Sequence, residues 1–268
     1  MLLFIRSETA NALKSRYARF YLAGIVLVSI LANLSMVAFR DILYGTNDGT
    51  QAYNLIMFAG SFFWIPYYTM IFVADMVFGK EYPDPYLRNR ANIRLKRYEQ
   101  YLGKLLAGFV VLLLFVAAAF VIFIGISFIF QISAGSISVS VVGDFALTLV
   151  LSIPLFTTGL AFAFMFLFMF EDKKKAFAAF FILVVGIERL IMILGSEHVN
   201  IAVFAWIREN LLITPQFTTL QFYATRDVPK VIITSVLWTV VAAAAGCYCY
   251  LKNDTGKRCR RKTDEGRT

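Results

Sequence analysis

Residues 79–104 read GKEYPDPYLRNRANIRLKRYEQYLGK, a densely basic segment between two long apolar runs. A Lys or Arg near the centre of a bilayer costs about 2.5–3.5 kcal/mol on insertion scales, so charge of this density does not cross the hydrocarbon core. We therefore expect a membrane-flanking element between two spans. A short helix in such a place is typical of membrane proteins that dock with a soluble partner.

The composition indicates an all-α integral membrane protein. Of the 268 residues, 59% are hydrophobic and 16% are charged, and the mean hydropathy is +0.70. A helix needs about 20 apolar residues to cross a bilayer. Glu188 and Arg189 interrupt one of the apolar runs, which makes it the weakest candidate. Residues 1–251 are predicted to form one transmembrane domain with six spans, at about 20–39, 53–78, 103–132, 145–170, 176–195 and 231–251.

The distribution of basic residues predicts the orientation. With six spans the two termini share one side with the loops at 79–104 and 171–175, and most of the 26 basic residues fall on that side. By the positive-inside rule this side is the cytoplasm. The charge of +9 is then explained by topology and by contact with anionic lipid, and it does not indicate a nucleic-acid partner. The basic tail, 252–268, is expected to be disordered.

The N-terminal residues have the pattern of an amphipathic helix. Apolar side chains alternate with polar ones at roughly helical spacing. We expect a helix that lies in the membrane interface and leads into the first span, with an irregular polar tail as the alternative. The apolar positions are Leu2, Ile5, Leu13 and Tyr17, and the polar ones are Arg6, Glu8, Lys14 and Ser15.

Motifs for catalysis, metal binding and nucleotide binding are missing from the sequence. The chain has one histidine, His198, and no GxSxG or P-loop motif. Its three cysteines, Cys247, Cys249 and Cys259, form no CxxC pair. We therefore predict no catalytic residues, no metal site and no cofactor on this chain, and no enzyme.

The segment 196–230 is too polar to span a membrane, yet it is rich in large apolar residues. Val199, Val203 and Trp206 fall on one face if the first part is helical. Thr214-Pro215 is typical of the start of a second helix. Two short re-entrant or interfacial helices are one interpretation, and an ordinary extracellular loop is the alternative.

Several residues inside the spans carry specific expectations. Pro66 and Pro154 are expected to kink spans two and four. Asp75 is expected to pair with Lys80 or Arg97. Glu188 is expected to face the protein interior and to bond a polar group of another helix or Arg189.

The order of these elements resembles the permease subunits of type-2 ATP-binding-cassette exporters. Those permeases often carry an acidic residue, then a Gly-Thr-Ile-Lys/Arg-Asn-like run, then Arg seven residues before a Lys. Here Glu81 precedes Leu87-Arg88-Asn89, and Arg97 precedes Lys104 by seven, although Pro85-Tyr86 replaces the Gly-Thr. The alternative is a purely topological role for these basic residues. The resemblance implies a coupling helix that contacts an ATPase through Glu81, Asp84, Tyr86, Leu87, Arg88, Asn89, Asn92 and Arg97.

The resemblance also implies a function and an assembly. Two permeases, either identical or paired with a sister subunit, would bind two copies of an ABC ATPase that carries ATP and Mg. In a bacterial cell membrane they would export a peptide or another hydrophobic or amphipathic substrate. Glu188, Arg189 and Trp206 would line the path or gate, which the helices within 196–230 would close on the outer side. An ion-gradient-driven secondary transporter and a non-catalytic membrane scaffold are the alternatives.

Overall fold

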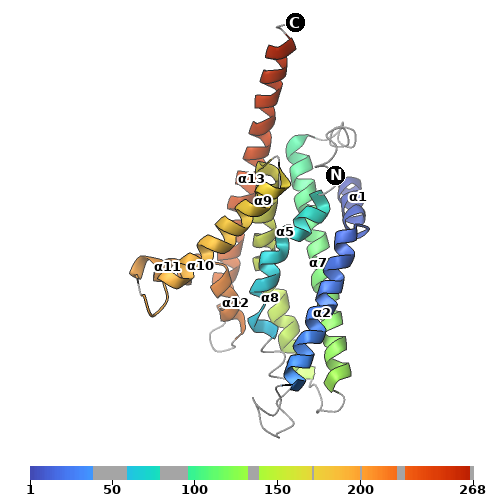
Figure 1. Cartoon of the computed structure of the whole chain (residues 1–268), viewed down its shortest axis with the longest axis vertical. Helices are drawn as coiled ribbons and strands as arrows, with labels where there is room; N and C mark the ends of the chain where they lie inside the picture. The colour runs from blue at the N-terminus through green and yellow to red at the C-terminus, as the bar shows by residue number, and fades with distance from the viewer. Residues whose placement is uncertain are drawn as a thin grey trace.

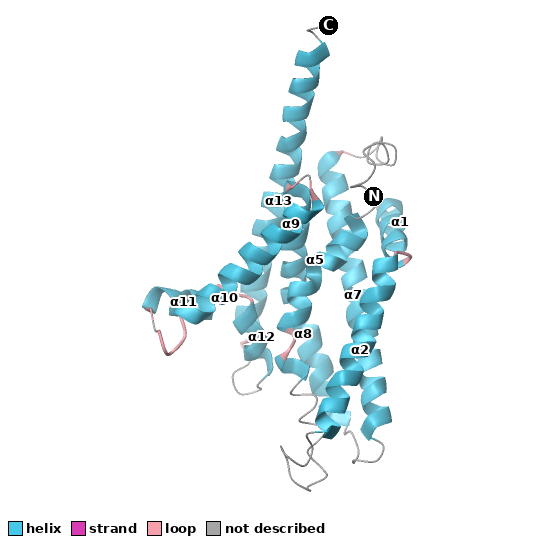
Figure 2. Ribbon diagram, viewed as in Figure 1, coloured by secondary structure: helices cyan, strands magenta, loops and turns pink. Residues whose placement is uncertain are grey.

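The computed structural model describes residues 1–38, 59–78, 96–131, 139–170, 172–199, 201–221 and 227–265. Within these ranges every regular element is helical (Figure 2). The elements are α1 Leu2–Leu13, α2 Arg16–Ala38, α5 Trp64–Phe78, α7 Arg97–Gln131, α8 Val139–Met169, α9 Lys173–Phe180, the π-helical η1 Phe181–Gly186, α10 Ile187–Leu194, α11 Ala202–Asn210, α12 Thr214–Gln221 and α13 Val228–Glu265.

Five helical segments are long and apolar enough to cross a membrane. They are Arg16–Ser35, Arg97–Phe130, Val139–Met169, Lys173–Leu194 and Val228–Lys252. This is compatible with a multi-pass membrane protein. The second expected span is described only as α5, which has 15 residues and is about 22 Å long at 1.5 Å per residue. Residues 39–58 lie outside the described part, so the layout with six spans stays a prediction.

The long helices run side by side, and one arm leans away from them (Figure 1). α8 packs against α13 on one side and α5 on another, while α2 packs against α7. The arm consists of α9, η1 and α10 and continues into α11. The N-terminus, the start of α9 and the end of α13 all lie toward the upper end of the view, whereas α12 lies near the lower end. On which side of a membrane the termini lie stays a prediction.

Aromatic side chains form much of the buried core. Tyr67 of α5, Tyr101 of α7 and Phe164 of α8 are fully buried. α5 and α8 approach closely at Gly159, where a Cβ atom would lie 2.9 Å from the backbone oxygen of Tyr67. Glycine is therefore required at that position for the two helices to pack as they do. Burial of this core holds α5, the helix that carries the site residues described below, against α8.

Pro66 lies in the first turn of α5, directly after a turn at 62–63 that separates α5 from the helical residues 59–61. The interruption lies at the carbonyl of residue 62, to which the missing N–H of Pro66 would bond. Two local expectations differ from the structure. The cluster Lys173–Lys175 opens α9 instead of forming a loop, because Asp172 caps that helix. α13 continues to Glu265, so the backbone is helical where a disordered tail was expected. Lys and Arg are good helix formers, and adding residues to an existing helix costs less than nucleating a new one.

The N-terminal segment forms the expected helix, α1. Its Ala12 is buried, and the ring of Phe4 lies against Gly103 at the start of α7. Leu2 and Leu3 are more than four-fifths exposed on the opposite side. An apolar surface of this kind next to Arg6 agrees with the expected position at a membrane interface.

Candidate functional site

Glu188 is the centre of a polar cluster inside the apolar arm. It lies in the first turn of α10 and is 5% exposed. Its Oε1 accepts a hydrogen bond of 2.7 Å from the backbone N–H of Thr214, and its Oε2 accepts one of 3.2 Å from the hydroxyl of Tyr68. The hydroxyl oxygens of Tyr68 and Thr214 are 2.9 Å apart. Either hydroxyl can be the donor in that third bond.

The cluster connects three helices that are distant in sequence. Tyr68 comes from α5, Glu188 from α10 and Thr214 from the start of α12. Thr214 opens α12, where the first backbone N–H groups have no partner within the helix. The carboxylate of Glu188 supplies one such partner from outside, and negative charge at a helix N-terminus is favourable. The expected bond between Glu188 and another helix is therefore present: the two carboxylate oxygens of Glu188 accept hydrogen bonds from Tyr68 of α5 and Thr214 of α12.

Arg189 points to aromatic rings. Its guanidinium carbon lies 4.3 Å from the ring centroid of Trp64 and 5.4 Å from that of Tyr68. The two rings meet edge to face with their centroids 5.8 Å apart. Consecutive helical residues point about 100° apart, which explains why the acid bonds the hydroxyl of Tyr68 and Thr214 while the base lies against the rings of Trp64 and Tyr68.

The helix changes its winding just before this cluster. Residues 181–186 form the π-helical turn η1, which is defined by bonds from an N–H to the carbonyl five residues earlier. The N–H of Ile187 bonds the carbonyl of Ile182 in this way. Single π-helical turns within α-helices are frequent at functional sites. η1 therefore marks the region around Glu188 as a candidate site.

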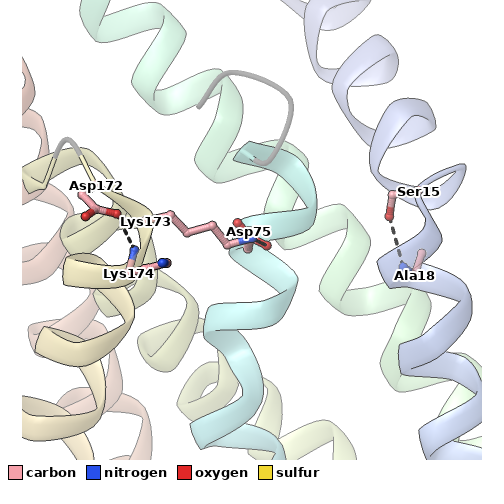
Figure 3. A network of polar contacts seen from close by, with 6 residues as sticks. All are labelled: Ser15, Ala18, Asp75, Asp172, Lys173 and Lys174. Atoms are coloured by element: carbon pink, nitrogen blue, oxygen red, sulfur yellow. Dashed lines mark hydrogen bonds and ion pairs between the residues drawn. The ribbon is translucent and has the colours of Figure 1, made fainter. Parts of the chain in front are cut away.

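A second charged contact lies at the other end of the same span. Asp75 of α5 forms an ion pair with Lys173, the first residue of α9 (Figure 3). The expected partners were Lys80, which lies outside the described residues, and Arg97; the ion pair that the structure describes is with Lys173. Its side chain faces α9, and the N-cap bond from Lys174 N–H to Asp172, 2.9 Å long, fixes the start of that helix. The ammonium of Lys173 also lies 5.0 Å from the ring centroid of Tyr17.

The remaining predicted site residues divide into two groups. Arg97 begins α7, whereas Glu81, Asp84, Tyr86, Leu87, Arg88, Asn89 and Asn92 lie outside the described residues. Trp206 does not join the Glu188 cluster, because its side chain is 59% exposed on α11. Glu188 and Arg189 are thus brought together with α5 and α12, and Trp206 belongs to an exposed apolar face.

Sequence reasoning missed Trp64, Tyr68 and the contact role of Thr214. The signal for Thr214 was present, because Thr-Pro marks a helix start and hence unpaired N–H groups. Tyr68 and Trp64 had a weaker signal, since a polar aromatic residue inside an apolar run usually finds a hydrogen-bond partner or a cation. Their pairing with Glu188 and Arg189 depends on contacts across more than a hundred residues.

In chemical terms the site is a structural link. Across the described part of the chain, no group of three or more His, Cys, Asp or Glu side chains could hold a metal ion. The hydrogen bond from Thr214 to Glu188 connects the predicted span that ends in α10 to the short helix α12, so that movement of either element would displace the other.

No protein-family model matches the chain, and the curated proteins include none that is detectably similar to it. The resemblance to exporter permeases therefore rests on the order of its elements and on the motif within residues 79–104.

Proposed function

We propose that the chain is the transmembrane subunit of an ATP-driven ABC exporter, coupled to a separate ATPase. It moves a peptide or another hydrophobic or amphipathic substrate out of the cytoplasm or the inner leaflet. Two permease copies, or this chain and a sister permease, assemble with two ATPase copies in a bacterial cell membrane. ATP and Mg are bound by the ATPase.

The observation that supports this proposal best is the pair of short helices after the fifth predicted span. α11 and α12 follow α10 in the order that the resemblance implies, and Glu188 hydrogen-bonds the first residue of α12. In an exporter, such a connection transmits movement of the span to an outer gate. α1, which precedes the first span with an exposed apolar surface, fits the same plan.

Coupling is tested by sequencing the genes next to this one and taking every P-loop ATPase that they encode as a candidate partner. The chain is co-expressed with each of them, and both co-purification and ATP hydrolysis are measured in nanodiscs. Arg88→Glu is expected to lower both at least tenfold while leaving membrane insertion unchanged, since a reversed charge at a docked surface is repelled. Lys174→Glu, on the exposed start of α9, is the matched control and is expected to have little effect.

The outcomes separate the alternatives. Equal behaviour of the Arg88→Glu and Lys174→Glu variants would leave the segment 79–104 with a topological role alone. Transport that follows an ion gradient without any ATPase would instead indicate a secondary transporter. A chain that binds no ATPase and moves no substrate would be a scaffold.

A further inference from the structure

Trp64, Tyr68 and Arg189 form a cation-binding arrangement that the chain fills with its own side chain. The guanidinium lies 4.3 Å from one ring centroid and 5.4 Å from the other. Distances of this size are those of a cation held over aromatic faces, which is also how proteins recognise quaternary ammonium ligands. The two rings stand edge to face and therefore offer two surfaces to one cation.

A fixed negative charge lies beside these rings. One carboxylate oxygen of Glu188 accepts a hydrogen bond from the hydroxyl of Tyr68, whose ring belongs to this arrangement. The other oxygen accepts one from the N–H of Thr214. Its carboxylate attracts a cation through space, and the attraction is stronger in apolar surroundings than in water. Arg189 is held by the aromatic rings and by this field. Another cation of similar shape would gain the same interactions.

Arg189 can leave this position without unfolding its helix. Its side chain is half-buried, and its neighbours Ile187 and Leu190 are exposed on the arm. Glu188 lies 15 residues after Lys173, about 22 Å along the helix from the basic end, so the next residue is nearer the opposite membrane surface. Long basic side chains reach such a surface by extending along the helix.

We infer that Trp64, Tyr68 and Glu188 form a binding site for the cationic group of an amphipathic substrate, and that Arg189 occupies this site when substrate is absent. That the bound cationic molecule is a transported substrate rests on the proposed export function. The site itself is a property of this chain and does not depend on the ATPase. It fits an amphipathic molecule with a guanidinium or a substituted ammonium group, such as a cationic peptide.

The test measures binding of tritiated tetraphenylphosphonium, a lipophilic cation, to the full chain in phosphatidylcholine nanodiscs. Empty nanodiscs give the background, and tetraphenylborate is an anion of the same shape. Arg189→Ala vacates the site, so the Kd for the cation is expected to fall about tenfold relative to the wild type. Arg208→Ala removes a half-buried arginine from α11 and is expected to leave the Kd unchanged. Trp64→Leu in the Arg189→Ala background is expected to abolish the gain.

Three results would overturn the inference: no gain in Arg189→Ala, an equal gain for tetraphenylborate, or a gain that survives Trp64→Leu. If Arg189→Ala fails to fold, Arg189→Met keeps an unbranched stem without the charge and is subject to the same criteria. The result is independent of the coupling experiment. Cation binding as expected together with no ATPase coupling would contradict the proposed export function and support the cation site. ATPase coupling together with no gain in cation binding would support the export function and contradict the cation site.

Discussion

The two ends of the span formed by α9, η1 and α10 satisfy their charges in different ways. At the basic end, Asp75 and Lys173 neutralise each other across two helices. At the other end, Glu188 is bonded by uncharged donors, while the adjacent Arg189 lies against aromatic rings. The first arrangement is one ion pair, whose members depend on each other. In the second, the acid and the base have different main partners and meet at Tyr68, so they depend on each other less directly than the members of an ion pair.

The largest effect is expected for Glu188→Leu. This change leaves the buried N–H of Thr214 without an acceptor and removes the acceptor of Tyr68, so we expect a loss of about 3 kcal/mol in the free energy of unfolding. Glu188→Gln keeps a carbonyl oxygen for Thr214, and its loss is expected to be about 1 kcal/mol. Unfolding by SDS in mixed micelles measures both variants. Equal losses would mean that the hydrogen bonds at Glu188 carry little of the stability.

The second prediction concerns the ion pair. Lys173→Met leaves the carboxylate of Asp75, whose side chain is 3% exposed, without its cation, and we expect a loss of about 2 kcal/mol. Adding Asp75→Asn removes the unpaired charge, and this second change is expected to restore at least half of that loss. Lys174→Met, at an exposed position, is the control. A double variant less stable than Lys173→Met would argue against the ion pair as the source of stability.

A double-mutant cycle sharpens the comparison directly. For Asp75→Asn with Lys173→Met, the coupling energy is expected to exceed about 1 kcal/mol, because each residue is the other's partner. For Glu188→Gln with Arg189→Met, it is expected to stay below about 1 kcal/mol, because the two residues interact through Tyr68 and through space instead of as an ion pair. The same unfolding measurement serves both cycles. Similar coupling at the two ends would show that the two arrangements do not differ in energy.

The smallest effect is expected at Tyr17, whose ring lies near the ammonium of Lys173. Tyr17→Leu removes this cation–π contact at an exposed position, and the expected loss is about 0.5 kcal/mol. Tyr17→Phe keeps the ring and is expected to behave as the wild type. A loss in Tyr17→Phe as large as in Tyr17→Leu would assign the effect to the hydroxyl.

The elements that the sequence predicted well have local causes. Five of the six apolar runs contain helices that begin three to six residues before the expected spans, and Thr214-Pro215 opened α12, because composition and helix-start chemistry act over a few residues. The start of α9 was missed by three residues, although Asp172 is a good N-cap.

The partners of the charged residues have no local cause and were harder to predict. Asp75 is 98 residues from Lys173, and nearer basic residues fitted the sequence equally well. For Glu188 the class of partner was predictable, because a buried acid needs donors, but Tyr68 was not identifiable. The coupling residues before Arg97 lie outside the described part of the chain, so their role stays a prediction.

The π-helical turn η1 also determines the register of the whole arm. Ala176, Phe180, Val184 and Glu188 are all buried, and they follow one another at intervals of four residues. In a regular α-helix each such interval advances about 40° around the axis, so the last would turn away from the first. A π-helical turn winds more slowly and offsets this drift. It works as a register correction, which keeps one straight buried stripe from the basic end to Glu188. Removing a single residue from 181–186 would let the turn become α-helical and would keep the stripe on one face, because one interval of four residues would become three.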